Sequence, residues 1–399
     1  MNSKTAGANA PVITSPLFTH FTLSQRKMRY SSIIAQEGIK ERLRRQIVTG
    51  RIPHAQLFCG PEGCGKLPMA LAFAEALLCQ SPIDGTPCGK CRSCKMMKSL
   101  EHPDLHFLFP NKRSSEETMS TAHLRTWREE LQRSSYLDTK RWYAAMGTEN
   151  QQPIINVKDA AYMADALSLT AQQGGYRVVI IWHAELINEQ AANKILKVLE
   201  EPPAQTVIIL ITDAPERLLQ TIVSRTQAIE FPALSPAEIQ AALVKEHGMA
   251  NEMALTVARS ANGSYTQAVN LIQANEEAAV FFDLFVQLMR KCYMRDIKEM
   301  HKWSELVAEW GREKQKNFLR YCQHMVRENF IFNFQEPELN YLAVNERDFS
   351  TRFSPYINER NVIGIMEELS LAERDITQNV NPRMVFFDFA LKMIVLLIK

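Results

Sequence analysis

One short segment constrains this chain of 399 residues more than any other: Gly60-Pro61-Glu62-Gly63-Cys64-Gly65-Lys66. It matches the GxxxxGK pattern of a phosphate-binding loop, between an apolar run at 56–59 and a run of helical spacing at 67–79. Glycines let backbone N–H groups converge on phosphate oxygens, and the lysine reaches the terminal phosphates. This context predicts a parallel α/β fold. The residues that would bind nucleotide are Gly60, Gly63, Gly65 and Lys66.

The groups that would hydrolyse a nucleotide in this loop are missing. Leu67 stands where a serine or threonine would ligate Mg²⁺. An apolar strand is predicted at 177–182, and Trp182 and His183 replace the Asp-Glu pair that would hold the metal and polarise water. His183 has no evident partner for metal binding, and Glu185 lies two residues too far along. We therefore expect neither intrinsic ATP hydrolysis nor a Mg²⁺ site, although backbone N–H groups could still hold a nucleotide.

Half of the eight cysteines fall within sixteen residues, with the spacing C-x8-C-x2-C-x2-C. Four thiolates so spaced favour a structural Zn²⁺ site, with an iron–sulfur cluster or a redox-active pair as alternatives. The predicted ligands are Cys79, Cys88, Cys91 and Cys94, and the remaining thiols, Cys59, Cys64, Cys292 and Cys322, are expected to be buried. Because the other cysteines are isolated, we expect a reducing compartment and a cytoplasmic location.

Length and charge bound the organisation of the chain. A length of 399 residues suggests two or three domains, and the net charge of +2 gives no general bias toward nucleic acid or membrane. No run reaches the roughly 18 apolar residues of a membrane helix. The first 27 residues resemble a disordered tail more than a secretory signal, and Met28 could be the initiator. A further strand at 206–211 follows a helix at 188–201, and only helices are expected after Pro232.

The run from Asn193 to Pro203, N-K-I-L-K-V-L-E-E-P-P, resembles the N-A-L-L-K-x-L-E-E-P-P hallmark of the bacterial clamp-loader AAA+ family. That family also carries a four-cysteine module after its P-loop helix, and a Ser-Arg-Cys motif where this chain has Ser224-Arg225-Thr226. The resemblance implies an α/β AAA+ P-loop domain with helices on both faces of its sheet, then an all-α lid and an all-α collar that makes oligomer contacts. The expected ranges are a tail at 1–27, the P-loop domain at 28–232 with a zinc module at 79–94 and an insertion at 110–155, the lid at 233–285 and the collar at 286–399.

Two subunit types of DNA polymerase III share this pattern, the gamma/tau motor and the delta-prime stator. The changes at Leu67, Trp182 and His183, with Thr266 in place of a sensor arginine, are similar to delta-prime. The resemblance implies that Arg225 acts in trans as an arginine finger on ATP bound by a neighbouring motor subunit. It also implies a pentameric ring with gamma/tau and delta that loads the sliding clamp on primer-template DNA.

Two alternatives remain open at this stage: an active ATPase of gamma/tau type, and a zinc-stabilised module that binds nucleic acid. Without the family resemblance, Arg225 would be taken for an ordinary surface arginine. Basic residues of the insertion could face DNA, but acidic residues interleave with them, which favours a solvated surface. These basic residues are Lys112, Arg113, Arg125, Arg128, Arg133, Lys140 and Arg141.

Overall fold

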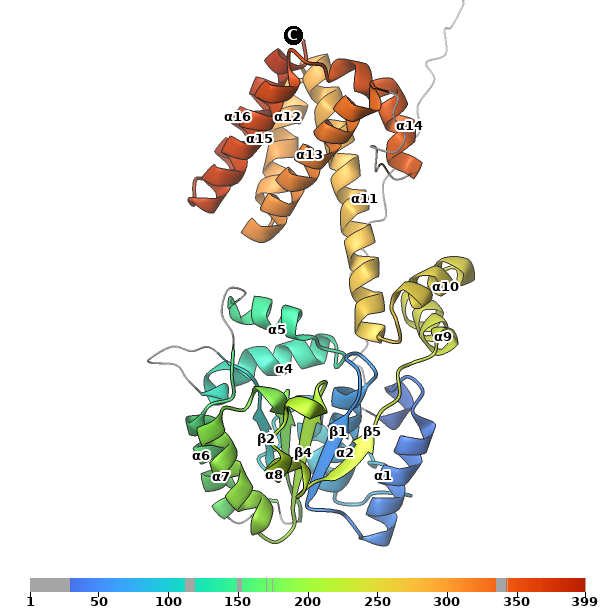
Figure 1. Ribbon diagram of the computed structural model, residues 1–399, viewed down its shortest axis with the longest axis vertical. Coiled ribbons are helices and arrows are strands. Elements are labelled where there is room, and N and C mark those ends of the chain that lie inside the picture. Colours follow the sequence, from blue (N-terminus) through green and yellow to red (C-terminus); the bar gives the residue numbers. More distant parts are fainter. Residues whose placement is uncertain are drawn as a thin grey trace, which may run out of the picture. The chain divides into compact units, whose positions relative to one another are not determined.

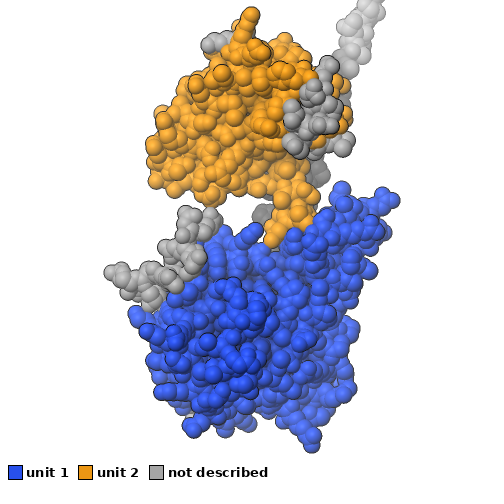
Figure 2. Space-filling model, viewed as in Figure 1, with its two compact units in different colours: residues 1–269 blue, residues 270–399 orange. Residues whose placement is uncertain are grey.

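The computed structural model describes residues 29–111, 119–148, 153–169, 171–173, 175–334, 342 and 344–398 (Figure 1). The chain divides into two compact units, residues 1–269 and 270–399, which are described separately (Figure 2). The predicted tail at 1–27 and Met28 lie outside the described residues.

The first unit is built on a five-stranded sheet of order β2-β3-β4-β1-β5, in which every paired strand is parallel. Both β3 and β4 are buried along their whole length, as expected for apolar strands covered on both faces. The predicted parallel α/β fold is therefore confirmed. The strands are β1 (Ala55–Cys59), β2 (Leu105–Leu108), β3 (Arg177–Trp182), β4 (Thr206–Thr212) and β5 (Gln227–Glu230).

Helices cover the two faces of this sheet (Figure 1). One face packs against α1 and α2, together with α4 and α5 from the insertion, and the other packs against α6, α7 and α8. Alternate residues of the central strands enter the two cores, as the two-residue period of a strand requires. The helices of this unit are α1 (Glu37–Thr49), α2 (Lys66–Leu78), α3 (Arg92–Lys98), α4 (Leu124–Arg133), α5 (Thr139–Met146), α6 (Val157–Ser168), α7 (Glu189–Glu200), α8 (Gln220–Val223), α9 (Pro236–His247) and α10 (Asn251–Ser260), with short 3-10 turns η1 (Tyr30–Ser32), η2 (Ser120–His123), η3 (Ala184–Leu186) and η4 (Pro215–Arg217).

The insertion packs an aromatic cluster against the end of β3. The ring of Trp127 stacks on Phe109 with centroids 4.3 Å apart. It also lies 5.0 Å from the ring of Trp142 and 5.1 Å from that of Trp182. Trp182 is only 3% exposed, so the residue that replaces a catalytic aspartate is part of the hydrophobic core. The described residues of the insertion form short helices joined by loops.

The second unit is helical throughout its described residues. An apolar stripe of helical spacing is buried in its core and consists of Phe281, Leu284, Phe285, Leu288 and Cys292. Among the described residues, no helix is both long enough and apolar enough to cross a membrane. The helices are α11 (Tyr265–Met294), whose first turns belong to the first unit, then α12 (Ile297–Ala308), α13 (Arg312–Phe332), α14 (Val344–Phe353), α15 (Val362–Thr377) and α16 (Pro382–Leu396), with a short 3-10 turn η6 (Ser354–Tyr356). The boundaries of lid and collar stay predictions.

Candidate functional site

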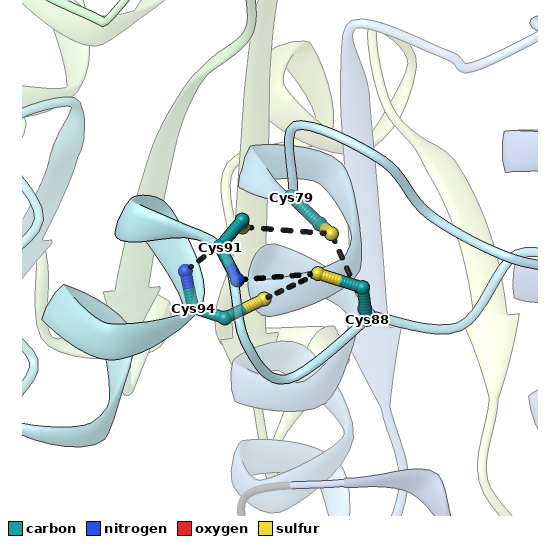
Figure 3. Close-up of side chains that lie close together, drawn as sticks. All are labelled: Cys79, Cys88, Cys91 and Cys94. Carbon is teal, nitrogen blue, oxygen red and sulfur yellow. Dashed lines mark hydrogen bonds between the residues drawn. The ribbon is translucent and has the colours of Figure 1, made fainter.

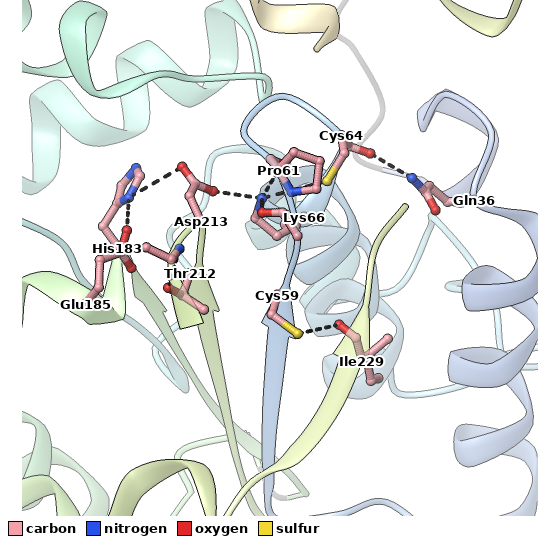
Figure 4. Close-up of polar contacts among 12 residues, drawn as sticks. Gln36, Cys59, Pro61, Cys64, Lys66, His183, Glu185, Thr212, Asp213 and Ile229 are labelled. Carbon is pink, nitrogen blue, oxygen red and sulfur yellow. Dashed lines mark hydrogen bonds and ion pairs between the residues drawn. The ribbon is translucent and has the colours of Figure 1, made fainter. Parts of the chain in front are cut away.

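The phosphate-binding loop connects β1 to α2, and Lys66 is the first residue of that helix. Its ammonium nitrogen donates hydrogen bonds to the carbonyl oxygens of Gly60 (2.6 Å) and Pro61 (2.5 Å) and forms an ion pair with Oδ1 of Asp213 at 2.7 Å (Figure 4). The Lys66 side chain is only 4% exposed. The negative charge that a terminal phosphate would bring to this lysine is thus supplied by the chain itself.

The loop keeps the backbone of a phosphate cradle, but two other segments lie against it. Gly63 and Gly65 have φ angles of 73° and 105°, which favour glycine. A Cβ atom at Gly63 would collide with the hydroxyl oxygen of Ser264, and the Gly63 carbonyl accepts a hydrogen bond from the backbone N–H of Tyr265 at 3.2 Å. Residues 264–266 therefore cover the loop from one side.

Tyr136, from the insertion, closes the loop from another side. Its hydroxyl accepts a hydrogen bond from the backbone N–H of Ile34 at 3.0 Å and lies beside Gly65, and its ring packs edge-on against Tyr265 with centroids 4.9 Å apart. The pocket that remains beside Lys66 is partly open to solvent, and its volume of about 30 Å³ has room for one or two water molecules rather than a triphosphate. No role for the insertion could be predicted from the sequence, because this contact joins residues about 100 positions apart.

The residues that we predict to stand in place of catalytic groups line this pocket. Trp182, His183 and Thr266 are among its lining residues, and so is Leu67, whose side chain supplies no oxygen. Thr266, which we aligned with the sensor arginine, is buried there. Thr212, at the family's other sensor position, is the buried last residue of β4, and its hydroxyl accepts a hydrogen bond from the N–H of Ala214 at 3.1 Å.

The expectation that His183 has no partners is wrong. His183 adopts a left-handed backbone conformation (φ 54°), and the following turn η3 brings Glu185 back toward the imidazole. Nδ1 of His183 lies 2.8 Å from Oε1 of Glu185 and 3.8 Å from Oδ2 of Asp213. Burial raises the pKa of Glu185, but hydrogen bonds and charge from His183 and the Thr212 hydroxyl outweigh burial and lower it overall.

The four predicted zinc ligands converge at the other end of α2 (Figure 3). The Sγ atoms of Cys79 and Cys91 are 3.9 Å apart, and those of Cys88 and Cys94 are 4.0 Å apart. Tetrahedral zinc with Zn–S bonds of about 2.3 Å would place its sulfurs roughly 3.8 Å apart, so the spacing fits a metal ion.

Backbone groups also prepare these sulfurs for a metal. Three N–H groups, of Cys88, Cys91 and Cys94, point at ligand sulfurs at 3.3–3.4 Å. Hydrogen bonds from the N–H groups of Lys90 and Cys91 lower the pKa of Cys88 to about 6, which favours the thiolate that a metal requires. The other four cysteines are buried, as predicted.

Arg225 lies near the amino-terminal ends of the strands, whereas Lys66 follows the carboxyl-terminal end of β1. It precedes β5, which pairs with β1 in the register Gln56↔Gln227, whereas the phosphate-binding loop follows the last residue of β1. The strand alone separates the two by about 13 Å, at roughly 3.3 Å per residue. Arg225 is 38% exposed and forms an ion pair with Oε1 of Glu200 at 2.8 Å. It cannot act on its own loop and is presented at the surface.

The basic residues of the insertion are mostly paired with acidic neighbours. Arg125 forms an ion pair with Glu129 at 3.0 Å, and Glu130 pairs with both Arg133 (2.5 Å) and Arg141 (2.7 Å). Arg125, Glu129 and Arg133 are exposed, as expected for a solvated surface, whereas Glu130 is buried beneath its two arginine partners. Lys112 and Arg113 lie outside the described residues.

Comparisons with known proteins identify relatives of this chain by sequence. The family model described as "DNA polymerase III, delta subunit" matches residues 35–235. The chain is 32% identical to the DNA polymerase III subunit delta' of Bacillus subtilis (strain 168) over 61% of each chain. It is 34% identical to the delta' subunit of Pseudomonas aeruginosa over 45% of this chain and 44% of that one. A gamma/tau subunit of Mycobacterium tuberculosis is 30% identical over 55% of this chain and 31% of its own length.

These matches span less than two thirds of the relatives. Among solved structures, a DNA polymerase III gamma subunit-related protein of Thermotoga maritima covers 90% of this chain and 99% of its own, at 14% identity and a TM-score of 0.34. A score this low carries no argument, so the family assignment depends on the sequence matches. The chain belongs to the DNA polymerase III delta-subunit family that the matching model describes, among clamp-loader relatives named delta' and gamma/tau.

Proposed function

We propose that this chain is a delta-prime-type clamp-loader subunit that hydrolyses no ATP itself and supplies Arg225 to ATP bound by a neighbouring subunit. One observation carries the proposal. The chain's own Asp213 forms an ion pair with Lys66 in a narrow pocket, whereas Arg225 is exposed at the opposite end of the strands.

The partners follow from the family. They are gamma/tau and delta subunits in a pentameric ring in the cytoplasm, with the sliding clamp and primer-template DNA bound through the complex. Within this proposal, residues 233–285 form the lid, residues 286–399 form the collar that contacts other subunits, and the cysteine quartet holds a structural Zn²⁺.

The energies favour a finger that leaves its resting contact. An exposed ion pair such as Arg225–Glu200 contributes about 0.2–1 kcal/mol. An arginine finger accelerates phosphoryl transfer by roughly 10³- to 10⁵-fold, or about 4–7 kcal/mol of transition-state stabilisation. The cost of breaking the pair with Glu200 is therefore small beside the gain at a neighbouring active site.

Among the described residues, the contacts beside Lys66 and in the insertion support neither alternative function. An intrinsic ATPase would need room for a triphosphate beside Lys66, and the cavity there is about 30 Å³. A module that binds nucleic acid would need unpaired basic side chains, and Arg125, Arg133 and Arg141 are held by carboxylates.

The test is reconstitution of the full-length chain with its motor subunits and delta. We expect Arg225→Ala to lower single-turnover ATP hydrolysis at the adjoining motor site by about 10³-fold or more, and to slow clamp loading. Arg217→Ala, which removes another exposed arginine of the same unit, serves as the matched control and should leave both rates unchanged. Equal rates for wild type and Arg225→Ala would refute the finger, and ATP turnover by the isolated chain that is lost in Lys66→Ala would refute the inactive site.

A further inference from the structure

His183, Glu185 and Asp213 form a cluster of metal-ligating side chains that the proposed function does not use. We propose that this cluster binds one transition-metal dication, of the Mn²⁺ or Zn²⁺ class, independently of the cysteine quartet. One imidazole nitrogen with two carboxylates is a donor set that suits such ions. Sites for Mg²⁺ and Ca²⁺ use oxygen ligands alone.

The geometry brings three donor atoms together from two strand ends (Figure 4). His183 and Glu185 follow β3 and Asp213 follows β4, and one ligand atom from each lies within 4.8 Å of the other two. Ligands bound at about 2.1 Å around one ion would be separated by roughly 3.0–3.4 Å. The distances of 2.8 Å and 3.8 Å from the His183 imidazole are close to this range, and the third pair of ligand atoms, from Glu185 and Asp213, lies within 4.8 Å, so the carboxylates would move toward the ion.

A buried, incompletely paired carboxylate points to a missing ligand. The Glu185 side chain is 6% exposed, and its Oε2 atom is buried with no hydrogen bond of ordinary geometry to any described residue. The nearby Thr212 hydroxyl lowers the pKa of this carboxyl but does not complete such a bond. An unsatisfied buried carboxylate oxygen is costly, and coordination to an ion would satisfy it.

The charges around the cluster leave room for a cation. Lys66 engages Oδ1 of Asp213, which leaves Oδ2 directed at His183. Two carboxylates and one ammonium give the group a net charge of −1 with a neutral imidazole. The bland alternative is that a proton on His183 Nδ1 bridges to Glu185 and no ion binds.

This site differs from the Mg²⁺ site of an ATPase. There the ion is held largely by phosphate oxygens, whereas here three protein side chains would supply the ligands, and two of them, His183 and Asp213, line the small pocket beside Lys66. The ion would tie the ends of β3 and β4 together. The inference does not depend on Arg225, so the two can fail separately.

The test uses Mn²⁺ and the full-length chain, with the cysteine quartet first filled by one equivalent of Zn²⁺. Thiolates select Zn²⁺ over Mn²⁺, so Mn²⁺ reports on nitrogen and oxygen ligands. Electron paramagnetic resonance of free Mn²⁺ should show one ion bound per chain. Glu185→Gln and His183→Asn should each weaken binding at least tenfold; asparagine tolerates the left-handed backbone at this position.

Glu216→Gln, an exposed carboxylate on η4, is the matched control and should bind Mn²⁺ as the wild type does. Mn²⁺ should also raise the melting temperature of the wild type and the control, but not of Glu185→Gln. No bound Mn²⁺, or equal binding by Glu185→Gln and His183→Asn, would overturn the proposal and leave the proton as the bridge. Folding of each variant is checked by its circular dichroism.

Discussion

The ionisable groups at the two ends of helix α2 differ in what neutralises their charge. At its first residue, the Lys66 ammonium is surrounded by carbonyl oxygens and the carboxylate of Asp213, all from the chain. At the other end, Cys79 converges with Cys88, Cys91 and Cys94, and the four sulfur atoms lie close enough together to share one metal ion. Four thiolates repel one another and are stable together only around a cation.

This difference indicates which of the two sites depends on a bound ligand for its stability. A site whose charges are matched internally gains little from binding a nucleotide, because that nucleotide must first displace Asp213 from Lys66. A site with unmatched charges depends on its ligand for folding. Substitutions at the two ends of α2 should therefore have different signatures.

The largest effect is expected at the thiolate end. Cys94→Ser should abolish stoichiometric zinc binding and destabilise the first unit by several kcal/mol, because metal-binding energy at a structural site is folding energy. Metal content and urea unfolding measure both. Cys59→Ser changes another buried thiol and should cost no more than about 1–2 kcal/mol with zinc retained. Equal stability of the two variants, with and without a chelator, would show that the quartet needs no metal.

Substitution of Lys66 should change the free energy of unfolding rather than the affinity for nucleotide. Lys66→Met leaves the Asp213 carboxylate and two carbonyl groups unpaired, and should cost about 2–4 kcal/mol in urea unfolding. Adding Asp213→Asn should restore part of this loss. Lys245→Met, at an exposed lysine of α9, should change stability by less than about 0.5 kcal/mol. A stable Lys66→Met variant that has lost measurable nucleotide affinity would mean that the cradle is open.

The smallest effect concerns Glu75, a buried residue of α2. Burial raises its pKa to about 7, although Arg29 and Lys98 act in the opposite direction. The folded protein then holds a proton that the unfolded chain releases between pH 4.5 and pH 7, so the carboxyl destabilises the fold as pH rises through this window. Glu75→Gln should raise stability by about 1–2 kcal/mol at pH 8 and change it little at pH 4. Thermal unfolding at both pH values measures this, and an equal effect at the two would contradict the raised pKa.

Local sequence patterns were enough to predict the central strands and the cysteine cluster of the first unit. The strands at 56–59, 177–182 and 206–211 and the cysteine quartet all follow from nearby residues, since strand periodicity and ligand spacing are local properties. The buried stripe of α11 is of the same kind.

The contacts that narrow the pocket beside Lys66 could not be predicted in this way. Tyr136 reaches Ile34 and Gly65 across about 100 and 70 residues, and no periodicity encodes such a contact. Glu185 was set aside because its spacing differs from that of a catalytic glutamate. Its contact with His183 depends on the left-handed backbone conformation of His183, and the sequence does not predict that conformation at this histidine.

Trp182 makes the loss of the catalytic aspartate hard to reverse in evolution. A mutation back to aspartate would empty the space beside Trp127 and bury a carboxylate among aromatic rings. Truncation of a buried tryptophan alone costs about 3–5 kcal/mol, much of the stability of an ordinary domain. An aspartate at position 182 would therefore cost much of the stability of the first unit, so the packing of the core favours an apolar side chain there.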